Sequence, residues 1–271
     1  MLSERLKKIF QSNNPKTKLV AYFVGCYPDY KTSLELIKKA IDNGVSVIEC
    51  GYPTSEASAE GPVIKIAHDK VLENGDTLKD IIKLVSEIRN YNQEVGIVLM
   101  GYIANLYKYP ISKFVTDISD AGADACLVVD APHELKEENI LREELNKKSL
   151  SLIKLIAPTT DDNRLNDIVS ISSGFLYQVN VSGVTGDKSA NEIDVSNFVK
   201  RIQKSTKLPI CSGFGIKSPK DAIKIANTGC QGVIVGSAFV KYIQDNLEDK
   251  NLPSNLGKYI STFTKELQRT G

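Results

Sequence analysis

The sequence has no apolar stretch of about 18 residues, the length that a membrane-spanning helix needs. Residues 1–6 read as the start of an amphipathic helix that carries charges throughout, unlike the apolar core of a secretory signal. Charge is also balanced, with 34 Lys and Arg against 33 Asp and Glu, so no strong field favours nucleic acid or an acidic membrane surface. These absences predict a cytoplasmic protein that binds a small molecule or another protein. Binding to nucleic acid or to a membrane is not expected.

Cysteine and histidine are scarce, and neither is spaced as a set of metal ligands. The five cysteines lack the CxxC spacing of a zinc or redox site, and four of them lie within or at the ends of apolar, strand-like runs. They are therefore expected to be reduced thiols of the core. The two histidines, His68 and His133, are assigned to surface or capping roles. The sequence thus predicts no metal site.

Apolar runs of strand length alternate with longer segments of helical period, and the alternation repeats eight times. The runs are rich in β-branched residues and leucine, which indicates strands buried on both faces, as in a parallel sheet. Several helical segments end in glycine just before the next strand, at Gly44, Gly122 and Gly229. The predicted strands are 18–24, 45–50, 95–100, 125–129, 152–156, 175–179, 208–211 and 232–235.

Eight strand–helix units in 271 residues favour a (β/α)8 TIM barrel over an open, doubly wound sheet, because such barrels commonly reach this length as one domain. No linker or low-complexity tract interrupts the alternation, so residues 1–271 are expected to form a single α/β domain. An N-terminal helix and a short extra helix from Ser237, after the eighth strand, complete the predicted architecture. In such a barrel the chemistry belongs at the carboxyl ends of the strands.

Glycine-bearing segments follow the last three predicted strands and form the most informative pattern in the chain. They are Ser182–Gly186, Gly213–Gly215 and Gly236–Ser237. Glycine lets backbone N–H groups approach a ligand closely, and the N-terminus of the short extra helix favours an anion. Each segment alone is also an ordinary turn device. Together they predict a site for the phosphate group of a small molecule.

Carboxylates stand at or after the ends of two predicted strands. Glu49 follows apolar residues in the second strand, where burial raises a pKa toward the range of acid/base catalysis, but a structural carboxylate fits equally well. Glu60 lies in the following loop, where an exposed charge is the ordinary interpretation. Asp130 follows the fourth strand and either takes part in the site or caps the turn into the next helix. The residues alone leave these alternatives open.

Many blocks of the sequence resemble the alpha subunit of tryptophan synthase, in the same order and with the same spacing. The resemblance runs over about residues 2–241, through Pro28-Asp29, Ile48-Glu49, Gly51-Tyr52-Pro53, Glu60-Gly61-Pro62, Gly101-Tyr102, Asp130-Ala131-Pro132, Ala157-Pro158, Ser182-Gly183-Val184-Thr185-Gly186, Gly213-Phe214-Gly215 and Gly236-Ser237-Ala238. It implies a carbon–carbon lyase that cleaves indole-3-glycerol phosphate to indole and glyceraldehyde 3-phosphate in tryptophan biosynthesis. It also implies that the enzyme uses no metal or organic cofactor and pairs with a beta subunit.

The resemblance further implies a role for each residue at a matching position. Glu49 matches the acid/base that moves protons at the carbon skeleton, and Glu60 matches an aspartate that holds the indole N–H. The implied substrate-binding residues are Tyr22, Tyr102, Asp130, Tyr177, Thr185 and Phe214. The implied phosphate-binding residues are Gly186, Gly215, Gly236 and Ser237.

The chain departs from the family mainly in the loop after the second strand. The family reads Pro-Phe-Ser-Asp-Pro-x-Ala-Asp-Gly-Pro, whereas residues 53–62 read Pro-Thr-Ser-Glu-Ala-Ser-Ala-Glu-Gly-Pro. In the family, this loop holds the second catalytic carboxylate and is the docking surface for the beta subunit. Three interpretations stay open: an active alpha subunit changed by drift, a divergent paralogue that acts on another phosphorylated substrate, and a non-catalytic subunit that regulates a partner enzyme.

Overall fold

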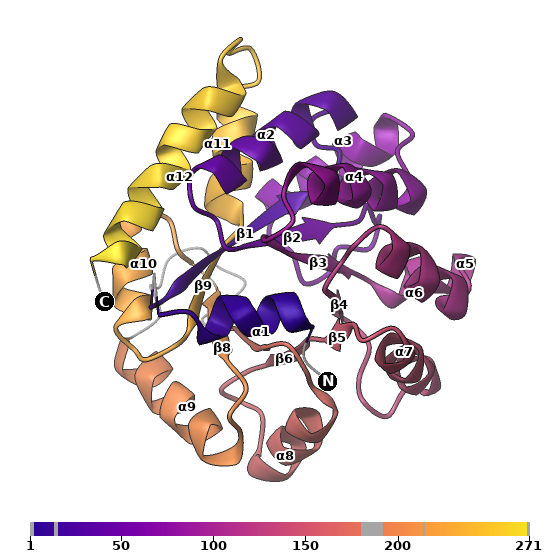
Figure 1. The fold of residues 1–271 in the computed structure, drawn as a ribbon, viewed down its shortest axis with the longest axis vertical. Helices are drawn as coiled ribbons and strands as arrows, with labels where there is room; N and C mark the ends of the chain where they lie inside the picture. The colour runs from indigo at the N-terminus through magenta and orange to yellow at the C-terminus, as the bar shows by residue number, and fades with distance from the viewer. Residues whose placement is uncertain (1–2, 14–15, 180–191, 214, 270–271) are drawn as a thin grey trace.

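Parallel strands form the centre of the structure, and helices surround them (Figure 1). The computed structural model describes residues 3–13, 16–179, 192–213 and 215–269. The strands are β1 (Lys18–Val24), β2 (Val47–Gly51), β3 (Gly96–Gly101), β4 (Ala125–Val128), β5 (Ser151–Leu152), β6 (Lys154–Ile156), β7 (Leu176–Val179), β8 (Ile210–Gly213) and β9 (Gly232–Val235). The helices are α1 (Glu4–Gln11), α2 (Tyr30–Asp42), α3 (Pro62–Glu73), α4 (Leu78–Tyr91), α5 (Ile103–Lys108), α6 (Ile111–Asp120), α7 (Lys136–Lys147), α8 (Asp162–Ile171), α9 (Glu192–Ser205), α10 (Pro219–Ala226), α11 (Ser237–Asp245) and α12 (Leu252–Gln268).

The sheet closes into a barrel through one interrupted strand. Hydrogen bonding gives the order β5-β4-β3-β2-β1-β9-β8-β7-β6, in which β5 and β6 stand at opposite ends. Along the chain, however, only Ile153 separates these two segments, and its N–H donates to the Cys126 carbonyl at 3.0 Å. The predicted TIM barrel is confirmed. The predicted fifth strand, 152–156, is two segments, because its first half pairs with β4 and its second half with β7.

The other predicted strands agree with the observed bounds to within two residues. The predicted strand 208–211 begins instead at Ile210, because Pro209 has no N–H to give to the ladder. The Pro209 carbonyl still accepts from the Leu176 N–H at 2.8 Å, so the chain enters the sheet there. The predicted extra helix at Ser237 is α11, and the predicted N-terminal helix is α1.

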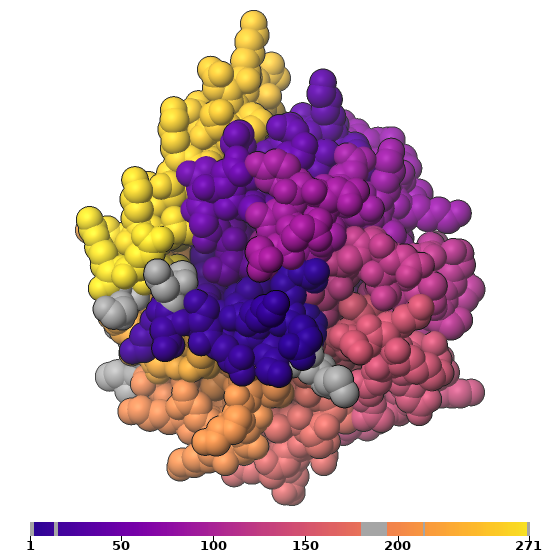
Figure 2. Space-filling view, in the orientation of Figure 1, coloured from indigo at the N-terminus to yellow at the C-terminus, as the bar shows by residue number. Residues whose placement is uncertain are grey.

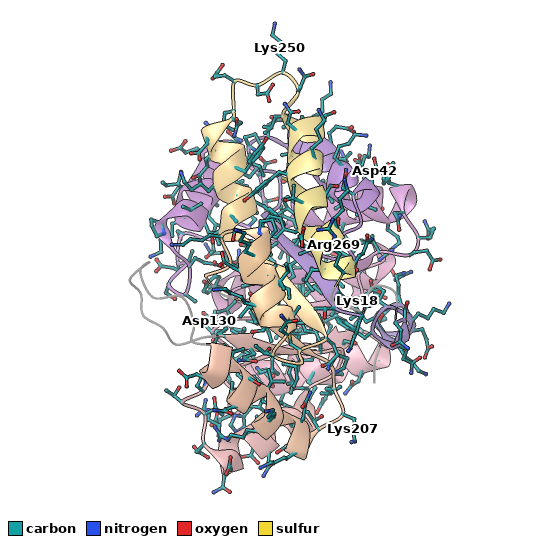
Figure 3. The ribbon with its side chains drawn as sticks, turned by 90° about the vertical axis from the view of Figure 1, so that its left-hand side faces the viewer. Lys18, Asp42, Asp130, Lys207, Lys250 and Arg269 are labelled. Atoms are coloured by element: carbon teal, nitrogen blue, oxygen red, sulfur yellow. The ribbon has the colours of Figure 1, made fainter. Side chains whose placement is uncertain are left out.

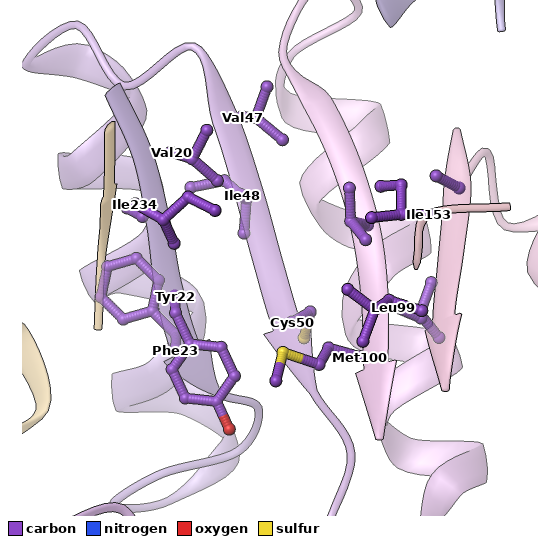
Figure 4. Close-up of a cluster of buried hydrophobic side chains, with 14 of the residues drawn as sticks. Val20, Tyr22, Phe23, Val47, Ile48, Cys50, Leu99, Met100, Ile153 and Ile234 are labelled. Atoms are coloured by element: carbon purple, nitrogen blue, oxygen red, sulfur yellow. The ribbon is translucent and has the colours of Figure 1, made fainter. Parts of the chain in front are cut away.

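Side chains alternate between the barrel interior and the surrounding helices along each strand. Phe23 stacks on Phe239 of α11 with 6.4 Å between ring centroids, so Phe23 faces the helices and its neighbour Tyr22 faces the interior. The register pairs Tyr22 with Glu49, and paired residues of parallel strands share a face, so Glu49 also points inward. Figure 4 shows buried side chains of β1, β2 and β9, among them Val20, Val47 and Ile234.

Helix α1 covers the amino-terminal end of the barrel. It lies across the strands in Figure 1, and its side chains fill the middle of the same face in Figure 2. Leu6 is fully buried, and a Cβ atom on Gly96 would lie 2.9 Å from its Cδ2, so the bare glycine allows α1 to approach β3. Figure 3 shows Asp130, which follows β4, toward the opposite end of the barrel from Lys18, the first residue of β1. That carboxyl end is the one that α1 leaves uncovered.

All five cysteines are buried free thiols, which confirms the expectation of reduced core residues. No described helix is both long and apolar enough to span a lipid bilayer.

Three helices end at glycines with left-handed backbone, as the sequence predicts. Gly44 has φ of 90°, Gly122 of 84° and Gly229 of 93°. Helix α7 ends in the same way on a residue that carries a side chain: Ser149 has φ of 56°, and the Leu150 N–H donates to the Leu145 carbonyl at 3.0 Å. A non-glycine residue is strained in this region because its Cβ crowds the following carbonyl.

We expect Ser149→Gly to raise the free energy of unfolding by about 0.5–1 kcal/mol, because glycine adopts this backbone without the steric penalty. Ser149 is exposed, so the substitution removes no packed atoms. Urea denaturation of wild type and variant measures the difference. Ser149→Ala is the matched control because it keeps the Cβ. An equal gain in both variants would contradict the explanation.

Candidate functional site

Glu49 lies on the inner wall of the barrel, near the carboxyl end of β2. Its side chain is fully buried, and neither carboxylate oxygen has a hydrogen-bond partner among the described residues. Burial, with a smaller contribution from the nearby charge of Glu60, raises the pKa of Glu49 from 4.5 to about 8. A carboxyl group in this state holds its proton at neutral pH and is able to donate it.

Glu60 stands beside this group, in the loop between β2 and α3. The side chain is half-buried, and burial raises its pKa from 4.5 to about 7, against the opposing effect of Lys65. The interpretation of Glu60 as an exposed, solvated charge is therefore wrong. Two carboxyl groups with raised pKa values thus lie close enough for the charge of Glu60 to act on Glu49, an arrangement typical of paired acid and base groups.

The loop that carries Glu60 is anchored to the segment after β3. The Ala59 N–H donates to the Tyr102 hydroxyl at 3.2 Å, and the Asn105 side-chain amide donates to the Pro53 carbonyl at 2.9 Å. Tyr102 itself is buried, and burial followed by the charge of Glu60 raises its pKa. Tyr102 thus lies near Glu60 and fixes the backbone next to it.

Two tyrosines lie near Glu49: Tyr22 is its register partner on the neighbouring strand β1, and Tyr177 is on β7, four strands away in the sheet order. Burial raises the pKa of Tyr177, and the charges of Glu49 and Glu60 add to the effect. For Tyr22 burial comes first, followed by the charges of Glu60, Tyr102 and Glu49. The barrel therefore brings together five of the predicted site residues: Tyr22, Glu49, Glu60, Tyr102 and Tyr177.

Asp130 has a defined structural partner. Its side chain is exposed, and its Oδ1 accepts a hydrogen bond from the Ile103 N–H at 2.7 Å. Ile103 is the first residue of α5, so Asp130 caps that helix from the neighbouring βα unit. The sequence offered Asp130 as a cap of the turn into the helix that follows it. Asp130 does cap a helix, but that helix is α5 and not α7, so this alternative is wrong. Substrate binding by Asp130 stays a prediction.

Gly215, Gly236 and Ser237 lie beyond the ends of β8 and β9. Gly215 has φ of 69°, a conformation that favours glycine, and Gly236 is the N-cap of α11, whose first residue is Ser237. A Cβ atom on Gly236 would lie 3.2 Å from the Cβ of Tyr22. The N-terminus of α11, where an anion is favoured, is therefore next to the inner wall. The other predicted residues of the loops, Thr185, Gly186 and Phe214, lie outside the described residues.

His68 was missed as a candidate, and its assignment to a surface or capping role is wrong. It lies on α3, is only 2% exposed, and places Nε2 3.3 Å from the Tyr22 hydroxyl. The sequence does contain a sign that His68 is buried, because helical spacing places it on the same face as the apolar residues Ile64, Ala67 and Val71. Burial lowers the pKa of His68 to about 4, so the ring is neutral. His133 is half-buried, with Nδ1 3.2 Å from a Glu134 oxygen.

Within the described part of the chain, no group of three or more His, Cys, Asp or Glu side chains is placed to hold a metal ion.

The chain matches the model of one protein family, described as tryptophan synthase alpha chain, over residues 9–267. Similar solved structures include tryptophan synthase subunit alpha from Legionella pneumophila, with 29% identity, a TM-score of 0.90 and 98% of both chains covered. Another is a tryptophan synthase structure from Mycobacterium tuberculosis, with 27% identity, a TM-score of 0.88 and 99% of both chains covered. A third, from Aquifex aeolicus, has 28% identity and a TM-score of 0.85, with 97% of both chains covered.

Proposed function

Since this chain belongs to the tryptophan synthase alpha chain family, we propose that it cleaves indole-3-glycerol phosphate to indole and glyceraldehyde 3-phosphate. The reaction is a retro-aldol cleavage of the bond between the indole ring and the glycerol chain. The observation that carries the proposal is the pair of carboxyl groups in the barrel mouth, Glu49 and Glu60, with pKa values raised to about 8 and about 7.

The cleavage adds a proton to the indole carbon and removes the proton of the hydroxyl next to the breaking bond. The ring nitrogen gives up its proton only transiently and regains it when indole forms. Protonated Glu49 donates to the indole carbon, and as a carboxylate it then accepts the hydroxyl proton, so it ends in its starting state. Glu60 holds the indole N–H from the other side. Because the two groups are buried or half-buried, their effect on the developing charge is stronger than in water.

The phosphate of the substrate is proposed to bind at Gly236 and Ser237, with Gly215 nearby. The N–H groups at the start of α11, which has no side-chain cap, and the helix dipole both favour an anion there. Tyr22, Tyr102, Tyr177 and Asp130 are proposed as the remaining contacts within the described residues. A beta subunit is the proposed partner, and the altered loop 53–62 is the surface on which this pairing depends.

Purified protein assayed with indole-3-glycerol phosphate tests the proposal. We expect indole release on its own and faster release when a tryptophan synthase beta subunit is added. Turnover without any response to the beta subunit would favour a paralogue with a changed partner. Absence of indole in both conditions would refute the proposed reaction and favour the other two interpretations, a different phosphorylated substrate or a regulatory role.

A further inference from the structure

The Tyr22 side chain spans the distance between the proposed phosphate site and the carboxyl pair. Its Cβ would lie 3.2 Å from a Cβ on Gly236, at the N-terminus of α11. At its other end, the hydroxyl oxygen would lie 2.5 Å from a Cβ on Gly51, which follows Glu49 by two residues on the same face of β2. The side chain has room there because neither Gly51 nor Gly236 carries a Cβ atom. A phosphate ester held at Gly236 and cleaved at Glu49 therefore lies alongside this ring.

His68 fixes the far end of the ring. Its Nε2 lies 3.3 Å from the Tyr22 hydroxyl, and its Nδ1 is buried with no hydrogen-bond partner within the described ranges. A neutral imidazole has one donor and one acceptor nitrogen. An unpaired buried N–H is less readily tolerated than an unpaired acceptor, which assigns the proton to Nε2. In that tautomer His68 donates to the hydroxyl oxygen, and the hydroxyl keeps its own proton for another acceptor.

We propose that His68 is a positioning residue that holds the Tyr22 hydroxyl so that it donates a hydrogen bond to an oxygen of the substrate's glycerol chain. The inference rests on the proposed function, because it takes the substrate to be an aryl-glycerol phosphate. The hydroxyl lies close enough to both carboxyl groups to feel their charges. Burial is the main cause of the raised pKa of Tyr22, and the charges of Glu60 and Glu49 add to it. The oxygen next to the breaking bond gains negative charge during cleavage. A hydrogen bond donated by the Tyr22 hydroxyl stabilises that charge.

Kinetics of indole release test the role of His68. We expect Tyr22→Phe and His68→Leu each to lower kcat about tenfold, with KM changed less than about twofold, because one hydrogen bond to the developing charge is lost. The double variant is expected to be no slower than Tyr22→Phe alone, since His68 acts through that hydroxyl. His68→Gln, whose amide donates in place of the imidazole Nε2, is expected to recover most of the rate. Additive losses, or full activity in His68→Leu, would overturn the proposal.

Imidazole NMR provides a second test that needs no turnover. The chain has two histidines, so His68→Gln identifies the His68 signal directly. We expect the Nε2 resonance to move in Tyr22→Phe but not in Tyr177→Phe, and to respond to glycerol 3-phosphate in the wild type but not in Tyr22→Phe. No response in the wild type would refute the substrate contact. If the wild type releases no indole but shows this response, the proposed reaction fails and the positioning role of His68 stands.

Discussion

Replacing Glu49 with glutamine is expected to lower indole release by about a thousandfold, since a positioned acid/base group contributes roughly 10²–10⁴ in rate. Glutamine keeps the shape of the side chain and removes its transferable proton. Steady-state assays with indole-3-glycerol phosphate measure the effect. Glu73→Gln, an exposed change on α3, is the matched control and should keep the wild-type rate.

The same substitution is expected to change the pH dependence of stability. The folded state raises the pKa of Glu49 from 4.5 to about 8, so between these values it retains a proton that the unfolded chain has lost. The carboxyl group therefore lowers stability progressively as pH rises through this window and has no such effect below it. Glutamine cannot ionise, so Glu49→Gln should be more stable than the wild type at pH 8, by on the order of a few kcal/mol, and about equal near pH 4.

Urea denaturation at several pH values measures this difference, with Glu73→Gln again as the control that leaves it unchanged. A folded Glu49→Gln variant that retains the full rate would exclude Glu49 as the acid/base and favour a regulatory subunit. A stability difference that does not grow with pH would show that the carboxyl group is solvated in the folded protein.

Replacing Asp124 with asparagine is expected to lower the free energy of unfolding by about 3–5 kcal/mol. The carboxylate is 2% exposed and accepts from Ser3 Oγ at 2.8 Å, Arg89 Nη2 at 2.9 Å and the Ile97 N–H at 2.9 Å. It also pairs with Arg5. Asparagine removes the negative charge and leaves the Arg89 guanidinium, which is 6% exposed, without its counter-ion.

Thermal and urea denaturation measure the loss at Asp124. Asp245→Asn is the control, because Asp245 forms an exposed ion pair with Lys241 at 2.9 Å, and such pairs contribute less than about 1 kcal/mol. A similar loss of unfolding free energy in both variants would mean that burial does not make the ion pairs of Asp124 stronger than an exposed pair. A stable Asp124→Asn variant would mean that the arginines find other partners.

The barrel was predictable because its signal is distributed over the whole chain. Each apolar run predicts a strand and each glycine predicts the end of a helix, independently of the others. An error at one of them therefore does not change the predicted fold. The interruption at Ile153 was not predictable, since it depends on which neighbour each half of the strand meets. Ser149 shows the limit of the glycine rule: its left-handed backbone is held by the surrounding helix end, and the residue type gives no sign of it.

The site was predictable where a strand position decides the environment. Glu49 follows apolar residues in a buried strand, so its burial and raised pKa follow from the alternation of side chains. Glu60 lies in a loop, and its half-buried position depends on how Tyr102 anchors that loop across the chain. His68 was misjudged because a lone histidine was weighed apart from its helix, although its spacing from Ile64 and Val71 placed it on the buried face.

The docking of α1 has a consequence for the order in which the parts of the protein fold. Ser3 bonds through its hydroxyl to Asp124 and through its N–H to the Ser151 hydroxyl, 121 and 148 residues further along. During translation, α1 therefore cannot complete these hydrogen bonds until Asp124 and Ser151 have also been synthesised. Closing such long loops is slow, so we expect α1 to dock late in folding, although it precedes its partners in the chain.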